Sequence, residues 1–339
     1  MLKRYGFFLW VTVVVLILVT IHLYTRFFTP PIGAAREVVI MIPRGVSFKL
    51  IAKELNSAGI IRNARDFSLL ASVRGAHRRV KAGEYHFTTP VRPLAVLNQL
   101  VAGMTIQHRV TIPEGYTIEE IGILIEREGV AKKEEFIEKA RDAGFVASRG
   151  LEGDSFEGYL FPDTYRLTKE APVEEIIDMM VARFKEVYTE SMDARGAKLG
   201  LTRREIVTLA SIIEKESGNS DERRRISAVF HNRMKRGIPL QSDPTVIYGI
   251  ADFDGNLTRR HLRTRTPYNT YLLYGLPPGP IANPGKEALE AAVEPVKEGY
   301  LYFVSKNDGS HYFSKSLREH NRAVYKYQRH RRRSKGAKG

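Results

Sequence analysis

Hydrophobic residues in this 339-residue chain form one long N-terminal run, and after it they recur at the spacings of short strands and amphipathic helices. No Asp, Glu, Lys or Arg occurs from Tyr5 to Thr25, and residues 11–19 are almost entirely aliphatic. A helix of about 20 residues is long enough to cross a hydrocarbon layer of about 30 Å. The pattern therefore predicts a transmembrane helix that is followed by folded units.

A cleaved signal peptide is the alternative interpretation of the apolar run. Its apolar core would be shorter, and no small-x-small cleavage motif stands before Pro30. We therefore expect a retained, single-pass anchor in the inner (cell) membrane. Lys3 and Arg4 favour a cytoplasmic N-terminus, although Arg26 makes the charge bias small. The rest of the chain would then lie in the periplasm or another extracytoplasmic space.

An internal repeat follows the apolar run. Residues 38–47 (VVIMIPRGVS) align with residues 108–117 (HRVTIPEGYT), and the match continues to Gly59 and Gly129. Each copy has the pattern of a strand, a Pro-x-Gly turn, a Ser or Thr cap, an amphipathic helix and a glycine stop. This unit resembles the LysM module, which binds polymers that contain N-acetylglucosamine. A duplicated structural unit without a sugar site is an equal alternative.

The order of the predicted elements indicates an α+β fold, because short strands and helices alternate without a long βαβ series. We expect four parts along the chain. They are a cytoplasmic tip, transmembrane helix and linker (residues 1–36), a LysM-like duplicated region (residues 37–150), a mixed α+β catalytic domain (residues 151–325) and a basic tail (residues 326–339).

One apolar helical run, residues 209–218 (LASIIEKESG), ends in two acids and a glycine. Thr202 and Glu205 have the spacing of a capping box that would begin this helix. Gly218 would provide a natural stop. The catalytic acid is therefore expected at the end of this helix.

Of the two acids in this run, Glu216 is the candidate for a raised pKa. Its helical neighbours are aliphatic, whereas those of Glu214 are smaller and wetter. A carboxyl against apolar side chains holds its proton closer to neutrality, as a general acid must. The alternative is that both acids flank an ordinary helix, solvated or paired with basic residues. The neighbours at i−3, i−4 and i−7 are Ile213, Ile212 and Leu209 for Glu216, and Ser211, Ala210 and Val207 for Glu214.

Successive loops in the second half of the chain combine aromatic and polar residues, as in the segment 157–165 (EGYLFPDTY). Aromatic faces pack on sugar rings, while acids and amides bond to the hydroxyl groups. Such loops fit the lining of a cleft, although each residue could equally be structural. The candidate binding residues are Gln241, Asp243, Tyr268, Asn269 and Asn283, with Glu157 and Asp163 as weaker candidates.

The net charge of +15 suggests an acidic partner, such as nucleic acid, anionic lipid or a cell-wall polymer, although the basic tail carries much of this charge. The absence of cysteine excludes disulfides, zinc thiolates and cysteine nucleophiles. The nine histidines lack ligand spacing, so we expect no metal and no cofactor.

Seven motifs then occur in order and carry a family resemblance. They are EGYLFPDTY from Glu157, ASIIEKES from Ala210, VFHNRM from Val229, PLQSDPTVIYG from Pro239, PYNTY from Pro267, GLPPGPIANPG from Gly275 and YLYFV from Tyr300. The set resembles the endolytic murein transglycosylases, or YceG-like family, from the anchor to about Tyr325. The basic tail is not part of the family pattern.

The resemblance implies a membrane-anchored lyase that cleaves the bond between N-acetylmuramic acid and N-acetylglucosamine within nascent peptidoglycan strands. The family's catalytic glutamate falls on Glu216. In such enzymes one carboxyl suffices, because the 6-hydroxyl of the muramic acid attacks its own anomeric carbon and forms a 1,6-anhydro end without water. The implied partners are glycan strands and peptidoglycan synthases, and the implied role is to end glycan elongation.

Three other functions compete with this prediction. The first is a noncatalytic peptidoglycan-binding scaffold in which Glu216 is structural. The second is a muramidase-type hydrolase that uses two carboxylates, with Asp243 or Glu157 beside Glu216. The third, a membrane-tethered nucleic-acid binder, rests on charge alone, and we expect no nucleic-acid partner.

Overall fold

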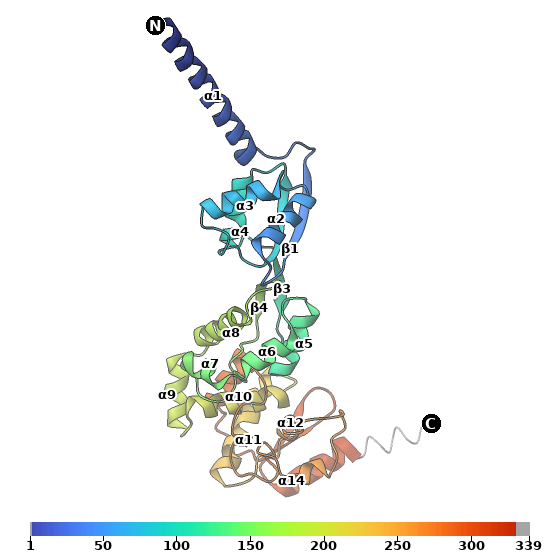
Figure 1. Cartoon of the computed structure of the whole chain (residues 1–339). Coiled ribbons are helices and arrows are strands. Elements are labelled where there is room, and N and C mark those ends of the chain that lie inside the picture. Colours follow the sequence, from blue (N-terminus) through green and yellow to red (C-terminus); the bar gives the residue numbers. More distant parts are fainter. Residues whose placement is uncertain (1, 330–339) are drawn as a thin grey trace, which may run out of the picture. The chain divides into compact units, whose positions relative to one another are not determined.

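The computed structural model describes residues 2–329 and divides the chain into two units (Figure 1). Unit 1 comprises the chain up to Arg109 together with the short segments Gly129–Ala131 and Arg166–Pro172. Unit 2 comprises Val110–Glu128, Lys132–Tyr165 and the chain from Val173 on. The sheets are three two-stranded ribbons among many helices, so the predicted α+β class is confirmed.

The first helix, α1 (Leu2–Phe28), contains the predicted apolar run. Its segment Leu9–Phe28 has a mean hydropathy of 2.0, and none of it is buried inside the protein. Within the described residues it is the one helix long and apolar enough to cross a membrane. A helix that is apolar on all sides and not covered by protein is compatible with a single-pass membrane anchor.

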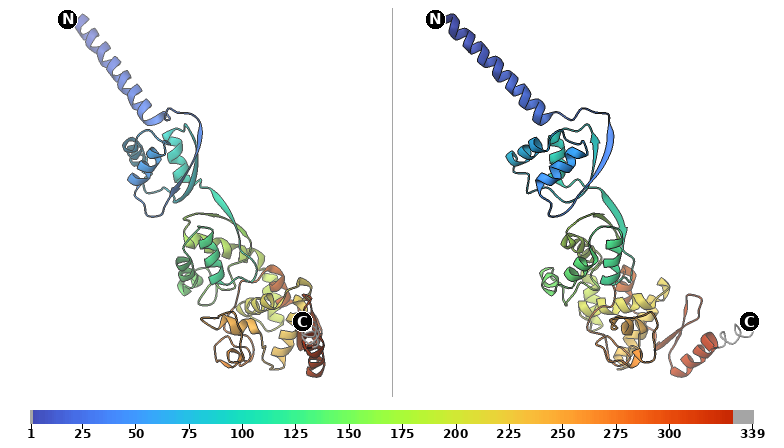
Figure 2. Two further views of the ribbon diagram at one scale, coloured as in Figure 1. Left: turned by 90° about the vertical axis from the view of Figure 1, so that its right-hand side faces the viewer. Right: turned by 45° about the vertical axis from the view of Figure 1, so that its right-hand side comes forward.

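Unit 1 is built on the antiparallel ribbon of β1 (Arg36–Ile42) and β2 (Gly83–Thr89), which pairs Arg36 with Thr89 and Ile42 with Gly83. Alternate residues of β2 are buried, because a strand with one covered face alternates inward and outward side chains. In both views of Figure 2 the helices of unit 1 lie on the same side of β1. These helices are α2 (Phe48–Ser57), α3 (Ala64–Val73) and α4 (Pro93–Ala102).

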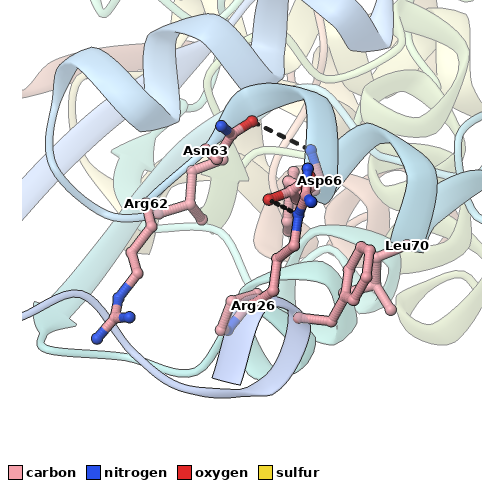
Figure 3. Close-up of a pocket in the computed structure, with 9 residues that line it drawn as sticks. Arg26, Arg62, Asn63, Asp66 and Leu70 are labelled. Carbon is pink, nitrogen blue, oxygen red and sulfur yellow. Dashed lines mark hydrogen bonds and ion pairs between the residues drawn. The ribbon is translucent and has the colours of Figure 1, made fainter. Parts of the chain in front are cut away.

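The end of α1 is tied to α3 by an ion pair inside unit 1 (Figure 3). The Arg26 Nε donates to Asp66 Oδ2 at 2.8 Å. Asn63 caps α3, and its Oδ1 accepts from the backbone N–H groups of Arg65 and Asp66 at 2.8 and 3.2 Å. Residues around this pair line a cavity of about 10 Å³, which is room for about one water molecule.

Both copies of the internal repeat form the predicted strand, turn and helix. The first is β1 followed by α2, and the second is β3 (Gln107–Thr111) followed by α5 (Ile118–Arg127). Gly45 and Gly115 occupy the turns with φ of 74° and 78°, a conformation that favours glycine. The likeness to the LysM module and its sugar site stay predictions.

The first copy lies in unit 1, whereas the second begins in unit 1 with β3 and continues in unit 2 with α5. The predicted domain boundary at residue 150 stays a prediction. The helix α5 packs against α6 (Lys133–Ala140), and both belong to unit 2. The strands β3 and β4 (Thr164–Thr168) pair with each other, and each begins in one unit and ends in the other. The boundary therefore follows packing between helices and not the period of the repeat.

Unit 2 is mainly helical, and α10 (Arg203–Glu216) lies at its core. Every residue from Ile206 to Glu214 is buried, as expected for a helix covered on all sides. The helices packed directly against α10 are α9 (Glu190–Lys198), α11 (Arg223–Lys235), α12 (Asp243–Tyr248) and α13 (Lys286–Val293). The remaining helices are α7 (Ala143–Ser148), α8 (Val173–Val187), α14 (Leu317–Val324), η1 (Ser220–Glu222), η2 (His261–Arg263) and the π-helical η3 (Tyr325–Arg329).

The sequence predicts a closing hairpin from residues 301–305 and 311–314, which flank the turn-rich segment 306–310, and the structure confirms it. The strands β5 (Tyr302–Ser305) and β6 (His311–Ser314) pair antiparallel, with Tyr302 opposite Ser314 and Ser305 opposite His311. Of the predicted basic tail, residues 330–339 lie outside the described residues.

Candidate active site

The capping box that was predicted to begin α10 is present. Thr202 Oγ1 accepts from the backbone N–H of Glu205 at 3.3 Å, and Glu205 Oε2 accepts from the backbone N–H of Thr202 at 2.8 Å. The helix ends at Glu216 because Ser217 is extended, with φ −100° and ψ 114°. Gly218 comes two residues after the end of the helix and does not have the left-handed backbone conformation of a glycine C-cap. The helix therefore ends near the predicted place, but the prediction that a glycine cap ends it is wrong.

Glu214 is buried and held by fixed partners. Its Oε1 accepts from Arg223 Nη2 at 2.9 Å and its Oε2 from the backbone N–H of Gly285 at 2.9 Å. Arg223 also pairs with Glu114 and Glu287. The expectation of wetter surroundings for Glu214 is therefore wrong, because other segments of unit 2 cover the side of α10 that carries it. A carboxylate engaged in this way is poorly suited to transfer protons.

Glu216 has different surroundings at the end of the same helix. It is half-buried, and its Oε1 accepts a hydrogen bond from the Ser242 hydroxyl at 2.6 Å. Burial raises the pKa of Glu216, the Ser242 hydrogen bond opposes this effect, and the negative charge of Asp243 adds to the rise. The raised pKa agrees with the direction expected from the aliphatic neighbours, and it favours the protonated form that a general acid needs.

Ser242 is held in place by a buried hydroxyl network. Its backbone N–H donates to Thr270 Oγ1 at 3.0 Å, and its carbonyl accepts from Thr245 Oγ1 at 2.6 Å. The two threonine hydroxyls are 2.7 Å apart and share a hydrogen bond. Because Ser242 is 1% exposed and fixed from two sides, it presents its hydroxyl to Glu216 in a defined position.

Two predicted binding residues flank Ser242 and are exposed. Asp243 begins α12, and its Oδ1 accepts from the Tyr271 hydroxyl at 2.6 Å. Burial raises the pKa of Tyr271, and the hydrogen bond to Asp243 adds to the rise. Gln241 has φ +51°, a strained conformation for a residue that is not glycine. The structure thus brings Asp243 close enough for its charge to act on Glu216, and Gln241 is the neighbour of Ser242 on the other side.

Two basic side chains also influence Glu216. Arg233 of α11 is buried and donates to the carbonyl oxygens of Leu301 and Leu240, each at 2.7 Å. His311 of β6 is held by Glu222 through its backbone N–H and through Nδ1, which lies 2.7 Å from a carboxylate oxygen. Their charges lower the pKa of Glu216, but the effect of burial is larger.

Glu157 and Asn283 belong to a buried cluster of hydrogen-bonded side chains. Glu157 Oε1 accepts from Asn283 Nδ2 at 3.0 Å, and Oε2 accepts from the Ile118 N–H at 3.2 Å and the Tyr248 hydroxyl at 3.3 Å. Burial raises the pKa of Glu157 to about 7. Both side chains are at most 2% exposed and have partners inside the protein. The structure thus gives them a supporting position away from the surface, and their role as glycan contacts stays a prediction.

Asn269, another predicted binding residue, is buried and bonds to the backbone of its own loop. It is fully buried; its Nδ2 donates to the Thr264 carbonyl at 2.7 Å, and its Oδ1 accepts from the Tyr271 N–H at 3.0 Å. These bonds shape the loop that carries Tyr271. Loop amides often act in this way, because buried backbone groups need partners.

Tyr268 and Asp163 complete the predicted set. Tyr268 is half-buried and packs edge-on against Tyr248, with ring centroids 4.8 Å apart. Asp163 is half-buried, and its Oδ2 accepts from Arg183 Nε at 2.7 Å. None of the hydrogen bonds or ion pairs among residues 2–329 joins either side chain to Glu216.

The sequence profile of the YceG-like family matches residues 40–326. The chain belongs to the YceG-like family. A relative from Bacillus subtilis (strain 168), named endolytic murein transglycosylase, is 35% identical over 306 residues, which cover 86% of this chain and 84% of that protein.

Two further proteins are similar to this YceG-like chain. A Streptococcus pneumoniae (serotype 2, strain D39) protein, also named endolytic murein transglycosylase, is 29% identical and matches 86% of this chain, but the match spans 58% of that longer protein. The crystal structure of a putative YceG-like protein from Listeria monocytogenes has a TM-score of 0.58 and 32% identity, and covers 86% of this chain and 100% of that one.

Four residues that act on Glu216 were not selected from the sequence: Ser242, Arg233, Tyr271 and His311. The first three stand inside recognised motifs of the YceG-like chain, PLQSDPTVIYG, VFHNRM and PYNTY, whereas His311 lies outside them. Ser242 also directly precedes Asp-Pro-Thr, where a serine is a typical helix N-cap. This signal could have identified the start of α12, although not the contact with Glu216.

Proposed function

We propose that this chain is an endolytic murein transglycosylase that cleaves the bond between N-acetylmuramic acid and N-acetylglucosamine in nascent peptidoglycan strands. The names of the relatives support this proposal. The observation that carries it is the half-buried Glu216, which has a raised pKa and one oxygen fixed by Ser242. The product is a 1,6-anhydro-muramic acid end, and its formation ends elongation of that strand.

Glu216 serves first as the acid and then as the base. Its proton goes to the glycosidic oxygen, and the bond from that oxygen to the anomeric carbon of the muramic acid breaks. The 6-hydroxyl oxygen of the same sugar then bonds to the anomeric carbon, and its proton returns to the Glu216 carboxylate. The cycle restores the enzyme without water and leaves one anhydro end and one free hydroxyl.

The hydrogen bond from Ser242 fits both halves of this cycle. It orients the carboxyl by holding Oε1, so that Oε2 is left for the substrate. It also stabilises the carboxylate that forms after the first proton transfer, because a hydroxyl donates a stronger hydrogen bond to an ionised acceptor. Burial keeps the proton on Glu216 before the reaction, and Ser242 limits the cost of releasing it.

Asp243 and Gln241 are the predicted binding residues placed best for contact with the glycan. Both are exposed and directly adjoin Ser242 in sequence. The charge of Asp243 acts on Glu216 and would also stabilise positive charge that develops at the anomeric carbon. Tyr268 would offer an aromatic face to a more distant sugar.

The location proposed for the chain follows from α1. This helix anchors the protein in the cell membrane with its N-terminus in the cytoplasm, and unit 2 acts on glycan outside it. The LysM-like repeat binds the same polymer, and peptidoglycan synthases that make nascent strands are the functional partners. A reporter fused after α1 would test the orientation.

Digestion of peptidoglycan by the full-length chain in detergent tests the reaction. Anhydro-muramic acid ends should appear in mass spectra with the parent and disappear with Glu216→Gln. Glu290→Gln, on α13, is the matched control and should keep the activity. Reducing ends, heavier by one water, would indicate a two-carboxylate hydrolase instead. Glycan binding by a folded parent without any cleavage would indicate a scaffold.

A further inference from the structure

We propose that the exposed face of α3 in unit 1 docks on the anionic lipid headgroups of the membrane that α1 spans. The inference rests on the membrane insertion of α1 proposed above. The docking surface, as defined here, consists of Arg62, Arg65, Leu69, Val73 and Arg74 together with the basic turn Arg78–Arg79.

The position of α3 follows from its bond to α1. Arg26 stands two residues before the end of α1 at Phe28, which is about 3 Å along a helix. The apolar segment Leu9–Phe28 matches the thickness of the hydrocarbon layer. Arg26 therefore lies at the outer boundary of that layer. Because its Nε is 2.8 Å from Asp66 Oδ2, the first turn of α3 lies at the level of the headgroups.

The outer face of α3 has apolar side chains that its own unit leaves uncovered. Phe67, Leu70 and Ala71 are buried in the core of unit 1. Leu69 and Val73 are instead 54% and 78% exposed. With Arg65 they form one stripe at i, i+4 and i+8 of the helix. A helix with an apolar stripe flanked by arginine is typical of segments that lie in a membrane interface.

The charge around this stripe is strongly positive. The segment 62–79 contains five arginines and one acid, Asp66, which is already paired with Arg26. Within residues 2–329, none of these five guanidinium groups forms an ion pair with a carboxylate. Figure 3 shows the Arg62 side chain pointing away from Asp66. The surface therefore has free cationic groups beside exposed apolar ones, which complements phospholipid headgroups of negative charge.

A polarity-sensitive dye on the full-length chain tests the docking. The protein has no cysteine, so Val73→Cys provides a single labelling site in an otherwise unchanged chain. Met104→Cys is the matched control, because Met104 is 65% exposed in the same unit but outside α3. The labelled proteins are placed in nanodiscs of phosphatidylcholine alone or of phosphatidylcholine mixed with phosphatidylglycerol.

The dye at position 73 should shift to the blue and become shielded from a water-soluble quencher only in the discs with phosphatidylglycerol. The dye at position 104 should respond equally in both discs. Adding Arg62→Gln and Arg65→Gln should lower the ratio of docked to undocked protein roughly five-fold for each arginine. Adding Arg259→Gln and Arg260→Gln, which removes the same charge from unit 2, should leave the ratio unchanged.

Equal emission from position 73 in both discs, with the protein inserted, would overturn the docking alone. Extraction of the chain from lipid by alkaline carbonate would overturn the anchor and the docking together. Cleavage of glycan in detergent is measured separately, and its loss would contradict the proposed reaction without any effect on the dye. The three results thus identify which proposal fails.

Discussion

The Ser242 hydroxyl donates a hydrogen bond of 2.6 Å to Glu216 Oε1, which joins the last residue of α10 to the N-cap of α12. The donor is itself fixed by Thr245 and Thr270. The acid is therefore oriented by a rigid partner that does not compete for its proton, because a serine hydroxyl stays neutral throughout the working pH range.

Replacing this donor should change the pH dependence of cleavage. The Ser242 hydrogen bond lowers the pKa of Glu216, so Ser242→Ala should raise that pKa further. The rate of a general acid falls as pH rises through its pKa, so the alkaline limb of the profile should move upward by about one pH unit. The maximal rate should fall roughly ten-fold because the carboxyl loses its orientation. The measurement is the rate of anhydro-end formation as a function of pH.

A conservative variant separates this role from a merely structural one. Ser242→Thr keeps a hydroxyl and should restore most of the rate and the position of the alkaline limb. If Ser242→Ala lowered the rate while the limb stayed in place, the serine would support the fold of the loop and not the acid.

Glu216 should cost stability while it supports catalysis. Its pKa is raised in the folded state, so its contribution to stability is complete below the unfolded pKa and is lost as pH rises through the folded pKa. Glu216→Gln removes this loss. The variant should be inactive and yet unfold at a higher denaturant concentration than the parent at neutral pH and above. The two proteins should approach each other in stability near pH 4.

Glu214→Gln serves as the comparison, because it should be less stable than the parent and still active, the reverse of Glu216→Gln. It breaks a buried pair with Arg223, which typically costs about 3 kcal/mol. Urea unfolding should therefore show a clear loss of stability, while the folded fraction still forms anhydro ends. A Glu216→Gln protein that was less stable than the parent at pH 8 would contradict the assigned surroundings of Glu216.

Glu157 should make the stability of unit 2 depend on pH without taking part in the reaction. Its pKa is about 7 when folded, against 4.5 ordinarily, so stability should be lost between these two values as pH rises. The loss is about 3 kcal/mol at most by linkage. Glu157→Gln should flatten the curve of unfolding free energy against pH between 4.5 and 7 and retain the ability to form anhydro ends.

The choice between structural and catalytic roles for Glu157 depends on that retained activity. Asn283→Ala removes the donor to Glu157 Oε1 and should lower stability in the same unit. Complete loss of cleavage by a folded Glu157→Gln protein would revive the two-carboxylate hydrolase.

Replacing Gln241 by glycine should increase the stability of the fold and weaken glycan binding. Its φ of +51° is strained for glutamine and free of strain for glycine, so Gln241→Gly should raise the free energy of unfolding by about 1 kcal/mol. If the side chain contacts the glycan, KM should rise several-fold while kcat changes little. Gln241→Asn, a residue that tolerates this conformation and keeps an amide, is the control. An unchanged KM in the glycine variant would remove Gln241 from the binding residues.

The sequence alone determined the elements whose causes are local. The apolar run that became α1, the capping box of Thr202 and Glu205, and the hairpin of β5 and β6 each depend on residues that are neighbours in the chain or nearly so. The choice of Glu216 over Glu214 also came from side chains one or two turns away on one helix, and it stays a prediction. Its premise of wetter surroundings for Glu214 is wrong, because Arg223 and Gly285 cover that carboxylate. Family motifs added the function, because they are long and ordered.

The pairing of polar groups from distant parts of the chain became visible only in the folded protein. Ser242 lies 26 residues beyond Glu216, and Asn283 lies 126 residues beyond Glu157, so no periodicity could pair them. The same polar loop residue is a binding candidate when exposed, like Asp243, and a structural support when buried, like Asn269. Burial and partners are set by the packing of distant segments, and these determine the pKa of a carboxyl and its access to substrate.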